Sequence, residues 1–182
     1  KQVPVLIMDT LELFDSTQIF EYLEDLAPDP ALWPSLPEER ALARKLELTA
    51  DEVFFPQVVV LMQHWADLTH PDACAAIENL NTHYLNLDHR LAKQNYLAGN
   101  YSFADIAFFM AQFFAAFLGG EMPETHKNLK AWRLRLLSRP AVASVIRPMC
   151  QFLMANNLRP PATEASHLIT PTSTNRPAEK RT

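Results

Sequence analysis

The chain has 182 residues, of which 48% are hydrophobic and 20% charged, and its net charge is −5 at pH 7. This length suffices for one domain and part of a second, and the composition is that of a globular protein with a substantial apolar core. With only 3 glycines, the chain cannot build a glycine-rich phosphate loop, and an all-β fold with many tight turns is disfavoured.

The charge and the cysteine content limit which partners and which cellular compartment we expect for this protein. The chain is acidic and has no basic stripe, which argues against nucleic acid as a partner. The 2 cysteines are too few for a disulfide framework, so we expect a reducing, cytoplasmic environment. The most apolar run, Ile106–Leu118, is shorter than the roughly 20 residues that a bilayer requires, so no membrane span is predicted.

The first residues predict two short strands and a helix. Val3–Met8 and Leu11–Phe14 are β-rich runs separated by a turn, and Asp15-Ser16 caps the helical apolar spacing that follows. Pro4 lies inside the first run, which requires a sheet edge, a bulge or a cis bond. A hairpin with one helix is not stable on its own, so we expect more sheet upstream of Lys1.

Helices dominate the remainder. Prolines in residues 28–37 predict a stiff linker, and Pro37 suits the first position of a helix that extends to about Leu68, with a kink at Pro56. A second helix, from near Pro71 to Leu91, has one apolar stripe at alternating three- and four-residue spacing.

A capping box opens the most apolar helix. Ser102 and Asp105 stand three residues apart, ahead of a helix at Phe103–Leu118 that is apolar nearly all round and is therefore expected at the centre of a bundle. Two further helices are predicted, at Asn128–Leu137 and Pro140–Asn156. Residues 159–182 are rich in Pro, Thr and Ser without periodicity, which predicts a disordered tail.

Several segments resemble glutathione transferases. Lys1-Gln-Val-Pro-Val-Leu6 and Leu13-Phe-Asp-Ser-Thr-Gln-Ile-Phe-Glu-Tyr-Leu-Glu24 resemble the second half of their thioredoxin-like domain. The capping box, Leu129-Lys-Ala-Trp132 and Arg139-Pro-Ala-Val142 resemble their helical domain, so the likeness covers about residues 1–158. The expected fold is α+β and mostly α: a partial thioredoxin-like strand-strand-helix unit (1–27), a linker (28–37), an all-α helical bundle domain (38–158) and the tail (159–182).

The resemblance implies a glutathione site near the N-terminus. It implies that Val3, followed by a cis Pro4, offers its main-chain N–H and C=O to the cysteinyl part of glutathione. It also implies that Asp15 and Ser16 hold the γ-glutamyl end, and that Gln2 reaches the peptide backbone. A helix N-terminus suits a carboxylate, and Asp15 suits the neighbouring ammonium. Taken alone, Asp15-Ser16 is a helix cap, and the two roles can coexist.

The implied activity is conjugation of glutathione, as co-substrate, to a hydrophobic electrophile by the complete protein, a homodimer with a role in detoxification. In the family the residue that activates the glutathione thiol follows the first strand, a stretch expected upstream of Lys1, so no catalytic residue is assigned and the chain alone is expected to be inactive. Three alternatives stay open: a non-catalytic interaction or assembly module, a glutathione-dependent reductase or isomerase of the same fold, and a helical dimerisation scaffold.

Other candidate chemistry is weaker. Four apolar residues have the character of a wall for a hydrophobic substrate, although residues at helical spacing are by default core: Phe54, Phe55, Val58 and Met62. Cys74, near a helix start, is more readily explained as a packed residue than as a reactive thiol, and Cys150 as core. The 6 histidines show no metal-ligand spacing, so no metal is expected.

Overall fold

The computed structural model describes residues 3–169 of the chain. It begins with an antiparallel hairpin of strands β1 (Val5–Met8) and β2 (Leu11–Phe14), in a register that pairs Val5 with Phe14 and Met8 with Leu11. The two-residue turn between them begins at Asp9, whose φ of 50° is the positive value that such turns require. The predicted strand–turn–strand is confirmed.

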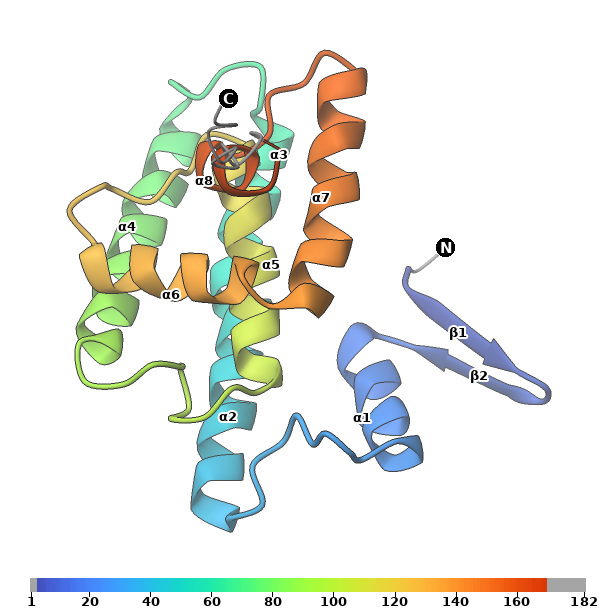
Figure 1. Ribbon diagram of the computed structural model, residues 1–182. Coiled ribbons are helices and arrows are strands. Elements are labelled where there is room, and N and C mark those ends of the chain that lie inside the picture. Colours follow the sequence, from blue (N-terminus) through green and yellow to red (C-terminus); the bar gives the residue numbers. More distant parts are fainter. Residues whose placement is uncertain (1–2, 170–182) are drawn as a thin grey trace, which may run out of the picture.

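Helix α1 (Ser16–Leu26) follows the hairpin directly and lies between it and the helical part (Figure 1). None of its residues is fully buried. Phe20 anchors it, because its ring stacks on that of Phe103 at 3.7 Å between centroids and meets Trp33 edge-on at 5.3 Å. The linker is held by Glu24, whose Oε1 accepts hydrogen bonds from the N–H groups of Leu32 and Trp33, both at 2.8 Å.

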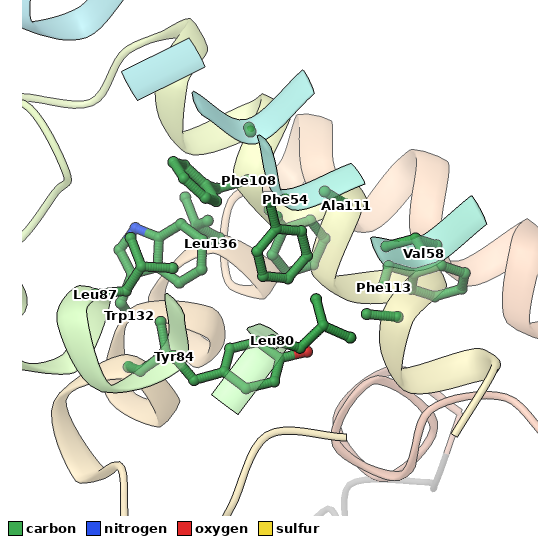
Figure 2. Close-up of a cluster of buried hydrophobic side chains, with 14 of the residues drawn as sticks. Phe54, Val58, Leu80, Tyr84, Leu87, Phe108, Ala111, Phe113, Trp132 and Leu136 are labelled. Atoms are coloured by element: carbon green, nitrogen blue, oxygen red, sulfur yellow. The ribbon is translucent and has the colours of Figure 1, made fainter. Parts of the chain in front are cut away.

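The remaining elements form a helical bundle, in which α5 runs through the middle (Figure 1). They are α2 (Pro37–Thr49), η1 (Ala50–Phe54), α3 (Phe55–Gln63), α4 (Pro71–Leu91), α5 (Phe103–Phe117), α6 (Lys127–Leu137), α7 (Pro140–Ala155) and α8 (Ala162–Leu168). Side chains from η1, α3, α4, α5 and α6 interlock in the core, where aromatic rings meet edge to face (Figure 2). The expected mostly α fold is confirmed, including the central place of α5.

The long first helix of the bundle changes winding before Pro56. Residues 50–54 form a π-turn, in which the N–H of Phe55 donates to the carbonyl of Ala50, five residues earlier. A proline inside an α-helix removes one hydrogen bond, and its ring clashes with the carbonyl four residues before it. The wider π-turn accommodates that carbonyl, so the irregularity predicted at Pro56 is a π-turn that joins α2 to α3.

Asp105 satisfies four donors in the interior. Its Oδ2 accepts from the N–H of Ser102 at 3.0 Å and from the Ser102 hydroxyl at 3.3 Å. Its Oδ1 accepts from the N–H of Leu97 at 2.9 Å and from the indole N–H of Trp132 at 2.7 Å. Burial raises the pKa of Asp105, and the four donors oppose that shift. The predicted capping box is confirmed, and its acidic residue also joins α5 to α6.

A second buried carboxylate caps α6 from another helix. Asp88, on α4, accepts from the N–H groups of Asn128 and Leu129 at 2.8 and 2.9 Å, and from the Asn128 side chain at 3.1 Å. These are the first-turn N–H groups of α6, which have no partner within the helix. Asp88 therefore acts as an N-cap for α6, although it lies 40 residues away in the sequence.

The expected tail at 159–182 is wrong for its described part. Residues 162–168 form α8, and Glu164 at its start is fully buried, where its Oε1 accepts from Nη2 and Nε of Arg133 on α6. The buried ion pair joins α8 to α6, and Leu168 and Ile169 pack against the core. The sequence did not reveal the ion pair, because its two residues lie 31 positions apart. Residues 170–182 lie outside the described residues.

None of the helices within residues 3–169 is both long enough and apolar enough to cross a bilayer.

The two residues of the capping box should contribute unequally to the free energy of unfolding. Ser102→Ala should cost about 1 kcal/mol, the usual loss for an N-cap. Asp105→Ala should cost about 3 kcal/mol or more, because it leaves buried N–H groups of Leu97 and Trp132 without partners. Urea unfolding of both variants checks this, with Ser144→Ala on the exposed face of α7 as the neutral control. Equal stability of all three variants would contradict the assignment.

The ion pair of α8 allows a separate test. Arg133→Met should lower the free energy of unfolding by about 3–5 kcal/mol, because it leaves the Glu164 carboxylate buried without its partner. The double change Arg133→Met and Glu164→Leu should recover most of that loss, since an apolar pair of similar volume often replaces a buried ion pair without penalty. A neutral Arg133→Met in denaturant unfolding would show that α8 is not held by this pair.

Candidate functional site

A cleft of about 650 Å³ lies between the N-terminal unit and the helical bundle. One wall consists of Val3, Pro4 and Ser16, and the opposite wall comes from η1 and the start of α3, with Asp51, Glu52 and Phe55. Helix α5 supplies the floor, with Phe103, Ile106, Ala107, Met110, Ala111 and Phe114. The Val3–Ser16 side, called the polar wall below for its main chain and the Ser16 hydroxyl, thus lies opposite the carboxylates of Asp51 and Glu52, with an apolar floor between them.

The Val3–Pro4 peptide bond is cis, as the resemblance implies. Val3 lies ahead of β1, outside the ladder that pairs Val5–Met8 with Leu11–Phe14, and 88% of its surface is exposed. Val3 lines the cleft and lies outside the strand register, so its main chain is not used by the β1–β2 ladder.

Asp15 begins α1 in an unusual backbone conformation. Its Oδ1 accepts from the N–H groups of Thr17 and Gln18 at 3.0 and 3.1 Å, so it caps the helix. Its φ of 73° with ψ of 132° is strained for a residue other than glycine. Such strain costs about 1–3 kcal/mol and is concentrated at ligand sites. Asp15 turns the chain so that Ser16 faces the cleft.

Negative charge gathers near the cleft. Burial raises the pKa of Asp51, and the charges of Asp15 and Glu52 add to that shift. Burial also raises the pKa of Glu47, against the hydrogen bond that the Thr17 hydroxyl donates to its Oε1. An ammonium group placed here would lower the electrostatic cost of holding these carboxylates together.

Parts of this chain are similar in sequence to glutathione S-transferases. The family model for the glutathione S-transferase C-terminal domain matches residues 55–140. Glutathione S-transferase 2 of Saccharomyces cerevisiae is 28% identical over 159 residues, which are 79% of this chain and 66% of the yeast protein. The chain thus spans slightly less than two thirds of the length of this relative.

Solved structures extend the likeness to the N-terminal unit. A glutathione S-transferase from Rhodospirillum rubrum F11 superposes with a TM-score of 0.78 at 26% identity, over 91% of this chain and 77% of that chain. The theta class glutathione S-transferase from Xanthomonas axonopodis pv. citri, solved with glutathione bound, is 30% identical with a TM-score of 0.65, over 77% of this chain and 76% of that one. The chain belongs to the glutathione S-transferase family.

In this family member, the structure assembles only part of the expected glutathione site. Val3, Pro4 and Ser16 line the cleft together. Asp15 lies next to Ser16 but is not itself part of the lining, and one of its carboxylate oxygens is used as the helix cap. Gln2 lies outside the described residues.

The predicted wall for a hydrophobic substrate is mostly wrong. Phe54 and Val58 are buried in the core of the bundle (Figure 2), with 0% and 2% of their surfaces exposed. Met62 is exposed on α3 but does not line the cleft, so Phe55 alone of the four contributes to it. The prediction assumed regular α-helical spacing through this segment. The π-turn at residues 50–54 interrupts that spacing, so the residues after it lie on a different face of the helix than expected.

The cleft residues of η1 and α5 were not predicted from the sequence. Asp51 and Glu52 resemble ordinary charges in the first turns of a helix, and Ile106, Met110 and Phe114 belong to a helix that is apolar nearly all round. No pattern in the sequence separates their cleft-facing side from the buried one. Neither cysteine lines the cleft: Cys74 is exposed at the start of α4, whereas burial raises the pKa of Cys150 to about 11.

The two roles of Asp15 make a testable prediction about stability. Asp15→Ala should cost about 1 kcal/mol or more, because the cap is lost and the strained φ remains. Asp15→Gly should change the free energy of unfolding by less than about 0.5 kcal/mol, because glycine adopts a positive φ freely and is a tolerable N-cap. Chemical denaturation of both variants decides this. A larger loss for the glycine variant than for the alanine variant would contradict the strain at this position.

Proposed function

We propose that this chain binds glutathione along the Val3–Ser16 wall of the cleft, and that the whole protein is a glutathione transferase that conjugates it to hydrophobic electrophiles. One observation carries the proposal: Val3 and Ser16, the latter at the N-terminus of α1, line a single cleft with an apolar floor. Glutathione needs the polar wall, and an apolar electrophile needs the floor.

The polar wall matches the γ-glutamyl end of glutathione, which has a carboxylate and an ammonium. Within residues 3–169, neither the N–H nor the hydroxyl of Ser16 has a hydrogen-bond partner. Both can donate to the carboxylate, and the dipole of the 11-residue helix α1 favours negative charge there. Asp15, whose Oδ2 takes no part in the cap, and Asp51 can then face the ammonium.

The rest of the cleft suits the other two parts of the reaction. Val3 can pair its main chain with the cysteinyl unit, as an added strand would. Phe55, Met110 and Phe114 lie across the cleft from it and offer an apolar surface to the electrophile. In the reaction the glutathione sulfur forms a bond to an electrophilic carbon, while the bond to the leaving group breaks or an adjacent double bond takes up the electron pair.

The proposed reaction also needs a donor that stabilises the thiolate of glutathione. Among the described residues that line the cleft, Ser16 carries the one hydroxyl and no residue carries a thiol. Since Ser16 is assigned to the γ-glutamyl carboxylate, we propose that this chain binds glutathione without activating its thiol. This observation also favours a second candidate, a non-catalytic glutathione-binding module of the same fold.

Titration calorimetry with glutathione tests the proposed binding. The parent chain should bind weakly, and Asp15→Gly should bind roughly tenfold to over a hundredfold more weakly, because a charge-assisted hydrogen bond is worth about 1.5–3 kcal/mol. Ser16→Ala should lose less, because its N–H remains. Asp25→Ala, at the other end of α1, is the matched control and should bind like the parent.

Two outcomes would overturn parts of the proposal. If Asp15→Gly and Ser16→Ala bind glutathione as tightly as the parent, the pair is only a helix cap. If the parent chain conjugates glutathione to a chlorinated aromatic electrophile faster than buffer does, the thiolate donor lies within the given residues, and the assignment of Ser16 to the carboxylate is wrong.

A further inference from the structure

The turn between α3 and α4 brings two histidines and an aspartate together. His64 ends α3, His70 is the N-cap of α4, and Asp72 lies in the first turn of α4. Asp72 Oδ2 is 3.8 Å from Nε2 of His64 and 3.7 Å from Nδ1 of His70. One potential ligand atom from each of the three residues lies within 4.8 Å of the others. The sequence suggested no metal site, because the ligands come from two helices joined by a turn.

Hydrogen bonds hold this turn in place. The N–H of Asp67 donates to the carbonyl of His64 at 2.8 Å, and the N–H of Thr69 donates to Asp67 Oδ1 at 3.0 Å. At the far end, Pro71 occupies the first helical position. A turn that is ordered without a ligand loses less conformational entropy when one binds.

The charges around the turn favour a cation. Asp67 and Asp72 flank the histidine pair, and hydrogen bonds from Thr69 hold the pKa of Asp67 below its usual range. A divalent ion would neutralise the charge of the two carboxylates that lie beside the histidine pair. This offsets the unfavourable effect of the N-terminus of α4 on a cation.

We propose that His64, His70 and Asp72 form a binding site for a divalent transition metal of the Zn²⁺ type. Imidazole nitrogen and carboxylate oxygen are ligands that Zn²⁺ takes at about 2.0–2.2 Å, and three protein ligands leave a fourth position for water. Ca²⁺ and Mg²⁺ prefer sites built from oxygen alone, so they should not bind here. None of the three residues lines the glutathione cleft, and the proposal stands apart from the proposed transferase function.

Metal binding requires a small local rearrangement. Tetrahedral ligands of Zn²⁺ stand about 3.3 Å apart, so the carboxylate must approach each nitrogen by a few tenths of an ångström. The two histidine nitrogens, which lie within 4.8 Å of each other, must close to the same spacing. The two rings now stack, with 4.0 Å between centroids and 13° between planes. Because a metal lies in the plane of each imidazole that it binds, one ring must turn about its Cβ–Cγ bond, a torsion with a broad range in histidine.

The rearrangement also has an identifiable cost. Nδ1 of His70 accepts the N–H of Asp72 at 3.2 Å, and a metal bound at Nδ1 would replace that cap. All three side chains are at least partly exposed, with 25%, 42% and 71% of their side-chain surfaces accessible for His64, His70 and Asp72. The ion can therefore enter without unfolding of either helix.

Calorimetric titration of the untagged chain with Zn²⁺ alone tests the site, together with the visible absorption spectrum of the Co²⁺ complex. We expect one ion per chain and Co²⁺ bands typical of tetrahedral nitrogen and oxygen ligands. His64→Ala and His70→Ala should each weaken binding at least about tenfold, since even residues behind the ligands contribute that much. His89→Ala, an exposed histidine elsewhere on α4, is the matched control and should bind normally.

Two further variants keep the test decisive. Asp72→Asn preserves the shape of an exposed side chain and should also weaken binding, even if His70→Ala disturbs α4. Cys74→Ala removes the exposed thiol nearest in sequence and should leave the affinity unchanged. The proposal is overturned if the parent chain binds less than one Zn²⁺, if His64→Ala and Asp72→Asn bind like the parent, or if Cys74→Ala abolishes binding.

Discussion

The buried carboxylate of Asp105 is the constraint on which the rest of the structure depends. A carboxylate in the interior is costly unless donors surround it, and Asp105 meets this demand with donors from three segments: its own helix start, the loop at Leu97 and the indole of Trp132 on α6. Each donor would be unsatisfied without the carboxylate. The start of α5 is therefore fixed relative to α6 and to the loop after α4.

The position of α5 in turn determines the shape of the cleft. Ile106 follows Asp105 directly, and Met110 and Phe114 continue along the same face as the cleft floor. Phe103, which lies between the two capping-box residues Ser102 and Asp105, stacks on Phe20 of α1, and its N–H donates to the carbonyl of Leu32 in the linker at 3.0 Å. One helix terminus thus anchors both the bundle and the N-terminal unit, so the polar wall at Ser16 faces an apolar floor.

Local patterns in the sequence predicted the parts of the structure that local chemistry determines. The hairpin, the cap at Asp15 and the capping box at Ser102 and Asp105 depend on residues a few positions apart, and all three are present. Contacts between distant residues could not be predicted in this way. The cap that Asp88 provides for α6 spans 40 residues, and α8 is joined to α6 by the pairing of Glu164 with Arg133, 31 residues away.

The candidate sites likewise contain parts that nearby residues determine and parts that depend on how distant segments fold together. The polar wall of the cleft was predictable, because Val3, Pro4 and Ser16 belong to one short segment whose motif resembles a known family. The place of Phe55 in the opposite wall was not predictable, because the π-turn at residues 50–54 places Phe55 in the cleft and Phe54 in the core. The cluster of His64, His70 and Asp72 depends on how a turn folds back between two helices.

The most direct test of the central claim, that glutathione occupies this cleft, is to map its binding by amide chemical shifts in a ¹⁵N-labelled chain. Glutathione bound in the cleft should shift the amide signals of Val3, Ser16 and Asp51–Phe55 and leave the amides near Asp72 unchanged. Unchanged amides around the cleft at saturating glutathione, or shifts confined to another surface, would contradict it.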